Sequence, residues 1–312
     1  MAARQTASAC CTAPASRAFA ASTTAPRRKA CSWRPAAAEQ QAGGAAAPAR
    51  RRGLLQLLAG GMLAAGLPGG SRSVASAATG VDQAAAVLEA PNWPEEFPFK
   101  PEFFQRYDES SDAAFYETPR YVTHIDDGAI KALTQFYAES FPASGSKDAA
   151  LLDICSSWIS HYPDGYTAGR VAGLGMNEAE LARNKQLTEY AVRDLNEDPS
   201  LPYEDNSFDM ITNAVSVDYL AKPIEVFREM HRCLKPGGTA IMSFSNRCFP
   251  TKAIAMWTST GDLDHIWIVG SYFHYSVPGG FTAPQAKDIS PRPSLLGRKG
   301  DPMYVVFARK AA

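Results

Sequence analysis

The stretch EVFREMHRCLKPGGTAIMSF, residues 225–244, pairs a helix pattern with a strand pattern across a sharp turn. Apolar residues recur at helical spacing before the turn, at Ile224, Phe227, Met230 and Leu234. The KPGG segment then stops the helix, because proline and glycine do not continue it, and TAIMSF follows as an apolar strand. This order is typical of a helix that returns the chain to the edge of a parallel sheet.

The same alternation extends outward in both directions. From residue 149 onward, short apolar runs alternate with amphipathic segments, which indicates a parallel sheet covered on both faces. The expected strands are 149–154, 170–175, 189–194, 208–215, 239–244, 285–289 and 303–309. The expected helices are 124–141, 178–187, 223–234 and 251–275, the last one interrupted near Gly261.

Two stretches carry a resemblance to a known family. LPYEDNSFDMI, residues 201–211, and the 225–244 stretch resemble class I S-adenosylmethionine-dependent methyltransferases of the type 11 group, and the similarity covers about 149–310. The resemblance implies an α/β, doubly wound, Rossmann-like sheet of seven strands with an antiparallel last strand. SSWISHYP and SFSNRCF further resemble plant and algal plastid members of that family.

The expected cofactor loop departs from the family pattern. The family places glycines two, four and six residues after an acid that corresponds to Asp153, and this chain has Cys155, Ser157 and Ile159 there. Glycine permits a positive φ and lets backbone approach a ligand closely. Two interpretations remain open: the hydroxyls of Ser156 and Ser157 donate to the cofactor carboxylate, or the serines cap a helix that begins at Trp158.

The expected ribose site departs as well. The family has an acid at the end of the second strand, where this chain has Gly175. Asn177 could replace that acid in part, but we favour Asn177 as a helix N-cap that forms a capping box with Glu180. If the pocket has only decayed, the double change Ser157→Gly with Gly175→Asp is expected to raise cofactor affinity.

The resemblance assigns the rest of the cofactor pocket to later strand ends. It implies that Asp194 binds the adenine amino group, that Leu195 backs the ring, and that the segment from Asn213 to Val215 lies near the sulfonium. Asp194 could equally be an ordinary turn residue, and we favour the pocket.

Candidates for acid–base catalysis are few. His124, Asp218 and Tyr219 occupy positions where residues of this family commonly face the acceptor. A second interpretation makes Tyr219 a core residue, and Asp126 with Asp127 suit a helix N-terminus. Cys155 could be a reactive thiol, but a small buried residue is the preferred interpretation.

Charge and cysteine usage exclude several classes of protein. Residues 1–77 contain ten Lys or Arg and one acid, whereas residues 78–312 carry a net charge of −10. An acidic body does not suit a nucleic-acid backbone or an anionic membrane surface. Three cysteines and scattered histidines after residue 77 show no ligand spacing, so no metal site is expected.

The first 77 residues read as a targeting sequence. Residues 1–49 are rich in Ala, Ser, Thr and Arg, as in a chloroplast transit peptide, and residues 50–77 resemble a thylakoid signal of the twin-arginine type ending near Ala77. An uncleaved membrane anchor is the alternative. Residues 78–148 form a lead-in with a cap helix, and 149–312 form the methyltransferase-like domain.

Two functions are therefore expected. The first is a plastid methyltransferase that uses S-adenosyl-L-methionine and a small-molecule acceptor. The second is an inactive methyltransferase-fold binding or assembly factor in the thylakoid lumen, with a plastid protein as partner. In both, the chain binds no nucleic acid and is at most peripheral to the thylakoid membrane.

Overall fold

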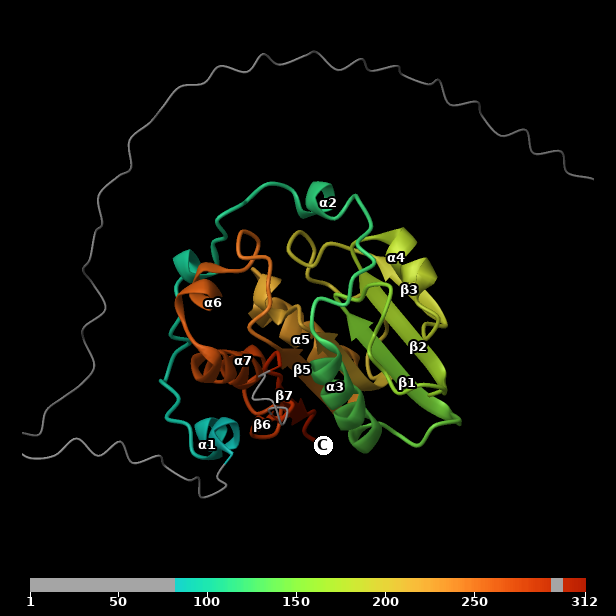
Figure 1. The fold of residues 1–312 in the computed structure, drawn as a ribbon. Coiled ribbons are helices and arrows are strands. Elements are labelled where there is room, and N and C mark those ends of the chain that lie inside the picture. The colour runs from blue at the N-terminus through green and yellow to red at the C-terminus, as the bar shows by residue number, and fades with distance from the viewer. Residues whose placement is uncertain (1–81, 293–299) are drawn as a thin grey trace, which may run out of the picture. The chain divides into compact units, whose positions relative to one another are not determined.

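A computed structural model describes residues 82–292 and 300–312 (Figure 1). The predicted transit peptide (1–49) and signal (50–77) lie outside the described residues. None of the helices in the described ranges is long and apolar enough to cross a membrane.

The described residues form one seven-stranded sheet with the order β3-β2-β1-β4-β5-β7-β6. Strand β7 is antiparallel to both β5 and β6, and the other pairs are parallel, as predicted. The strands are β1 Ser146–Ile154, β2 Ala168–Gly175, β3 Glu189–Val192, β4 Phe208–Ala214, β5 Leu234–Phe244, β6 Gln285–Asp288 and β7 Tyr304–Arg309. The chain therefore has the predicted doubly wound α/β fold.

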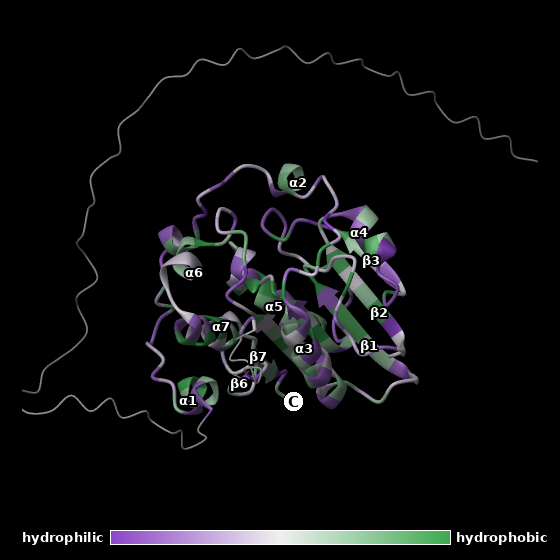
Figure 2. Ribbon diagram, viewed as in Figure 1, coloured by the Kyte–Doolittle hydropathy of each residue, from purple (hydrophilic) through white to green (hydrophobic). Residues whose placement is uncertain are grey.

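Apolar side chains fill both faces of this sheet, and the central strands are the most hydrophobic part of the ribbon (Figure 2). One face packs against α1, α5 and α7, and the other packs against α3. The helices are α1 Gln83–Glu89, α2 Asp112–Phe115, α3 Asp127–Ser140, α4 Glu178–Arg183, α5 Pro223–Cys233, α6 Ala255–Ser259 and α7 Asp262–Ser276, with 3-10 turns η1 Pro101–Phe104 and η2 Val217–Tyr219.

The 225–244 stretch folds as predicted, with one shift of boundary. Helix α5 buries Phe227 and Met230, and its C-terminus meets the first residue of β5 directly. The KPGG segment lies inside β5, where Gly237 has a φ of 77° and the register with β4 is irregular. The predicted interruption at Gly261 is confirmed, since this glycine is the N-cap of α7.

One of the two interpretations left open for Ser156 and Ser157, that they cap a helix beginning at Trp158, is wrong. Residues 155–167 connect β1 to β2 without any helix. Aromatic side chains do the packing instead: Tyr162 is buried, and its ring contacts Tyr137 of α3 and the C-cap Phe141 at 5.5 and 4.8 Å between centroids. Since this loop and α3 together cover the face of the sheet, the helix is not needed for burial.

The lead-in is mostly extended over 91–100, as its prolines predict, but the sequence did not reveal helix α1. Asp82 caps α1 by accepting hydrogen bonds from the amides of Ala84 and Ala85. Downstream, Asp126 caps α3 through the amide of Ala129, which confirms its helix-terminus interpretation.

Candidate functional site

A cavity of about 330 Å³ opens where four parallel strands end. In a doubly wound sheet, ligands bind at the carboxyl edge where the strand order reverses, here between β1 and β4. Segments that follow β1, β2, β3 and β4 all line the cavity, and the lead-in forms its opposite wall. The lining includes Asp112, Tyr116, Arg120, His124, Asp153, Cys155, Ser156, Ser157, His161, Gly175, Asn177, Glu180, Asp194, Leu195, Val215, Tyr219, Arg247, Cys248 and Phe249.

The loop after β1 keeps the turn of a glycine loop without its glycine. Cys155 has a φ of 54°, in the left-handed region that glycine adopts without strain. The amide of Ser156 donates to the carbonyl of Leu174 at 2.8 Å, which fixes the loop against β2. The backbone conformation of the predicted cofactor loop is therefore present, but a side chain at 155 now lines the cavity.

The two serine hydroxyls bind carboxylates of the protein. Ser156 Oγ donates to Asp153 at 2.6 Å, and Ser157 Oγ donates to Glu180. Burial raises the pKa of Asp153 to about 6, although hydrogen bonds from Ser156 and other hydroxyls act in the opposite direction. In this state neither hydroxyl is free to donate to a ligand carboxylate.

Gly175 is glycine for a steric reason. A Cβ at this position would lie 2.1 Å from the carbonyl oxygen of Ser156, which is fixed backbone. The side chain introduced by Gly175→Asp would displace the cofactor loop itself, so this geometry argues against a gain of cofactor affinity in the double variant Ser157→Gly with Gly175→Asp.

Asn177 is the N-cap of α4, which is the interpretation that the sequence favoured. Its Oδ1 accepts from the amide of Glu180 at 3.1 Å, and its Nδ2 donates to the carbonyls of Tyr116 and Glu117 in the lead-in. The predicted capping box does not form. The Glu180 carboxylate instead accepts from the amide of Arg120 at 2.6 Å and from Ser157, so it lines the cavity.

The segment after β3 places Asp194 and Leu195 in the cavity wall. The Asp194 carboxylate accepts from the amide of Asn196 at 2.9 Å, so it also serves the turn. Burial raises the pKa of Asp194, and the same hydrogen bond acts against that shift. Leu195 is 5% exposed.

The end of β4 divides between the cavity and the core. Val215 lines the cavity, whereas Asn213 is fully buried and is not among the lining residues. Asn213 Nδ2 donates to the carbonyl of Ile154 at 3.4 Å, and its Oδ1 has no hydrogen-bond partner within the described ranges. Asn213 thus contacts the end of β1, next to the loop, from the core and not from the cavity.

Backbone strain is concentrated around this cavity. Among the described residues, five other than glycine have a positive φ, and four of these line the cavity. They are His124, Cys155, His161 and Val215. The left-handed conformation costs about 1–2 kcal/mol for such residues, and strain of this kind clusters at ligand sites.

The three catalytic candidates lie in different environments. His124 and Tyr219 line the cavity, and the Tyr219 hydroxyl accepts from the amide of Phe249 at 2.8 Å. Asp218 is 2% exposed and does not line the cavity. Burial raises the pKa of Asp218 to about 8 and that of the Cys155 thiol to about 12, so Cys155 is not an activated thiol.

Several cavity residues carried no recognisable signal in the sequence. His161, in the loop that replaces the expected helix, is 6% exposed and its Nδ1 has no hydrogen-bond partner within the residues the structure describes. Burial, followed by the proximity of His124, lowers the pKa of His161 to about 4, so the imidazole is neutral at pH 7. Burial also lowers the pKa of His124.

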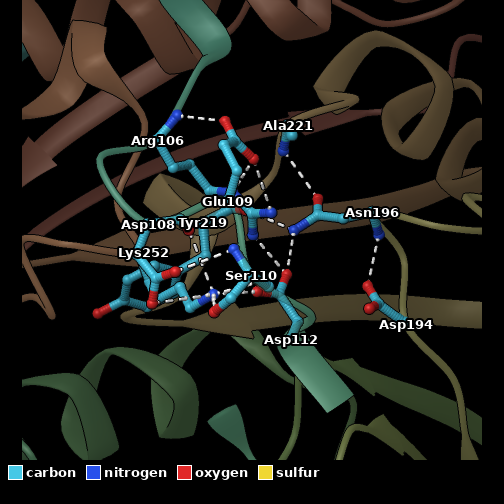
Figure 3. Close-up of polar contacts among 10 residues, drawn as sticks. All are labelled: Arg106, Asp108, Glu109, Ser110, Asp112, Asp194, Asn196, Tyr219, Ala221 and Lys252. Atoms are coloured by element: carbon cyan, nitrogen blue, oxygen red, sulfur yellow. Dashed lines mark hydrogen bonds and ion pairs between the residues drawn. The ribbon is translucent and has the colours of Figure 1, made fainter. Parts of the chain in front are cut away.

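A polar cluster holds the lead-in over the cavity (Figure 3). We name Arg106, Asp112, Asn196 and Lys252 the Asp112 cluster. Asp112 is 7% exposed and accepts from Arg106 Nη1 at 2.5 Å and from Asn196 Nδ2 at 2.9 Å, while Lys252 Nζ lies 3.2 Å away. These contacts join α2, the segment after β3 and the segment after β5.

The described residues contain no group of three or more His, Cys, Asp or Glu arranged to hold a metal ion. The cavity lining holds both acidic and basic side chains, among them Glu180, Asp194 and Arg120.

Comparisons with known proteins agree with this architecture. Residues 154–242 match the family described as "Methyltransferase domain". A biotin biosynthesis bifunctional protein of Teredinibacter turnerae is 30% identical over 148 residues, which cover 43% of this chain and 25% of that protein. A demethylmenaquinone methyltransferase of Staphylococcus epidermidis is 31% identical over 102 residues, which cover 30% of this chain and 42% of that protein.

Two solved structures are similar to part of this chain. The [4+2]-cyclase SpnF has a TM-score of 0.45 and 17% identity, with 64% of this chain and 92% of that chain covered. An S-adenosylmethionine-dependent methyltransferase from Mesorhizobium loti has a TM-score of 0.40 and 20% identity, with 57% and 98% covered.

The segment that matches a methyltransferase domain, residues 154–242, extends from the end of β1 into β5 of the sheet. The chain spans between a quarter and about two fifths of the length of the two curated relatives described above.

Proposed function

We propose that this chain binds S-adenosyl-L-methionine in the cavity and transfers its methyl group to a small-molecule acceptor in the plastid. One observation supports this most directly: the ends of β1 to β4 meet at the switch point of the sheet and line one cavity, with Asp153 and Asp194 among its walls.

The residues present fit the cofactor with one replacement. Asp194 and Leu195 would hold the adenine, and the loop at Cys155 and Ser156 would face the methionine part. No acid stands at Gly175, but the Glu180 carboxylate from α4 lines the same cavity and keeps unused lone pairs for ribose hydroxyls.

The cofactor, when bound, supplies an electrophilic methyl group. The protein's contribution is to orient the acceptor and exclude water, and the lead-in provides the cover for both. His124 and His161 are neutral imidazoles in the cavity wall, and each can accept a hydrogen bond or a proton from an acceptor group.

A second candidate function is a methyltransferase-fold protein that binds a plastid partner without transferring methyl groups. The helix-free loop 155–167 favours it, because no helix N-terminus follows β1 to bind a ligand carboxylate. The side chain of Cys155 lines the cavity where the family has a glycine, and this also favours the second function.

Calorimetric titration separates the two functions. We expect purified protein to bind S-adenosylhomocysteine, and Asp194→Ala to weaken binding roughly tenfold. Glu197→Gln is the matched control, since Glu197 is exposed in the same turn and does not line the cavity. Absence of heat at near-millimolar ligand would leave only the second function.

We also propose that the mature protein resides in the chloroplast, in the thylakoid lumen. The support is compositional: an acid-poor leader, the Arg50–Arg52 cluster, and a run of signal-peptide length. The acidic remainder favours a small-molecule or protein partner over nucleic acid, and at most peripheral contact with the thylakoid membrane.

A further inference from the structure

The geometry points to Arg120 as a binding site for an anionic group, carboxylate or phosphate, on the acceptor. Arg120 belongs to the lead-in and lines the cavity. The inference rests on the proposed function only where it assigns the bound anionic group to the methyl acceptor. Anion binding itself can be measured without the cofactor.

Aromatic rings hold the guanidinium in place. Its central carbon lies 4.3 Å from the centroid of Phe115, 5.6 Å from that of Tyr116 and 5.5 Å from that of Phe249. Stacking of this kind uses the face of the guanidinium and leaves its in-plane N–H groups available. The aromatic rings therefore fix the orientation of the Arg120 side chain without using its N–H donors.

The donors of this side chain have no partner within residues 82–292 and 300–312. Arg120 Nη1 is buried and makes no hydrogen bond there, and the guanidinium forms no ion pair with any described carboxylate. Its backbone amide, by contrast, donates to Glu180. A buried guanidinium donor left unpaired is unfavourable, and no described side chain offsets this cost.

Two of the carboxylates that line the cavity are already engaged. Asp112 pairs with Arg106 and Lys252, and Glu180 accepts from the amide of Arg120 and from Ser157. An anion that enters the cavity would thus find Arg120 as a cation not already neutralised by an ion pair in the described ranges. Arg247 also lines the cavity, but it is 62% exposed and pairs with Asp301.

The position of the guanidinium favours the acceptor over the cofactor. Phe249 follows β5, and its ring contacts Tyr219 and His124 at 6.1 and 5.4 Å. The residues proposed for the cofactor instead follow β1, β2 and β3. An aromatic surround with a fixed cation suits an aromatic or otherwise flat molecule that carries a carboxylate or phosphate.

Benzoate and phenyl phosphate are suitable probes, with benzamide as the neutral control. Calorimetry on the purified protein should show binding of at least one anion and weaker binding of benzamide. Arg120→Gln should reduce the anion affinity roughly ten- to a hundredfold, and Arg120→Lys should reduce it less. Arg170→Gln is the matched control and should keep the affinity of the wild type, since Arg170 also lies over an aromatic ring, 4.6 Å from the centroid of Phe208, but does not line the cavity.

The inference is overturned if neither anion binds the wild type at a concentration of about 10 mM, which corresponds to the weakest affinity that we would assign to a site. It is also overturned if Arg120→Gln and the wild type bind the anions with the same affinity. Both variants' thermal unfolding midpoints show whether they are folded, and Arg120→Lys keeps the test open if Arg120→Gln is not.

A second titration distinguishes the source of the anion. S-adenosylhomocysteine carries a carboxylate that methylthioadenosine lacks. If Arg120 serves the acceptor, Arg120→Gln should leave both affinities unchanged. A selective loss of S-adenosylhomocysteine binding would assign Arg120 to the cofactor and reject the acceptor site. A wild type that binds benzoate but not S-adenosylhomocysteine would reject the methyltransferase proposal while retaining the anion site.

Discussion

At Gly175 the backbone of the cofactor loop and the expected ribose site place opposite requirements on one position. The cofactor loop turns back so tightly that the Ser156 amide bonds to Leu174 and the Ser156 carbonyl sits over Gly175. With the loop in its present position, a Cβ at 175 and the Ser156 carbonyl oxygen cannot both be accommodated. The Ser156 carbonyl therefore links the two departures from the family pattern, at Cys155 and at Gly175.

We expect Gly175→Ala to lower the free energy of unfolding by about 1–3 kcal/mol, because the new Cβ meets fixed backbone. Gly173→Ala in the same strand is the control. Its Cβ would meet only the Leu187 side chain, which can rotate, so a smaller loss is expected. Urea denaturation of both variants makes the comparison. Equal losses would show that Ser156 does not constrain position 175.

Asp218 gives the clearest expected pH dependence. Burial raises its pKa to about 8 from the ordinary value of 3.8. Between these two values the folded chain holds a proton that the unfolded chain has released, so stability falls as pH rises through this window. Asp218→Asn removes the effect. Its stability relative to the wild type should rise between pH 5 and pH 8, by at most about 1.4 kcal/mol per pH unit.

Urea unfolding of Asp218→Asn across that pH range provides the measurement, and Asp164→Asn at an exposed position provides the control. Parallel stability curves for Asp218→Asn and the wild type would contradict the prediction. Because Asp218 does not line the cavity, binding of S-adenosylhomocysteine should be unchanged in this variant.

At the scale of elements, the fold could be predicted because the strands and the main helices each have a recognisable local sequence pattern. Helix α5 has an apolar face, and β1 is buried at six consecutive positions. The missing helix after β1 could not be predicted, since Ser156, Ser157 and the following residues suit an N-cap. Only the packing of Tyr162 against α3 explains why a loop suffices there.

The candidate site was predictable where strand ends define it and not where the lead-in completes it. Asp194 and Leu195 follow a strand, so their place at the carboxyl edge could be inferred from order alone. Arg120 and Glu180 enter the cavity through contacts between segments 60 residues apart in sequence. No local pattern encodes such a contact, because it depends on how the lead-in folds back over the sheet.

The Asp112 cluster is the contact that positions the lead-in, and Lys252 is its most buried cation at 1% exposed. Lys252→Met should destabilise the protein by about 3 kcal/mol, since it removes one partner of a buried ion pair. Lys235→Met is the control: Lys235 and Asp209 are each about one third exposed, so a loss of about 1 kcal/mol or less is expected.

Denaturation measures the free energy of unfolding of both variants, and limited proteolysis shows which segment of the chain has become accessible. Faster cleavage within residues 101–117 of Lys252→Met, with Lys235→Met unchanged, would show that the cluster fastens the lead-in. Similar cleavage in both variants would contradict that role.

At the scale of the whole molecule, charge divides the sequence near residue 77. The basic leader and the body of net charge −10 suit different environments, which is the pattern expected if the leader is removed. We therefore expect the chain recovered from the thylakoid lumen to begin near Ala78, as measured by N-terminal sequencing. Replacing Arg51 and Arg52 by lysine should block the second step and leave an intermediate in the stroma, because the twin-arginine pair is the proposed address. Recovery of an intact Arg50–Leu67 segment in membranes would instead establish an uncleaved anchor.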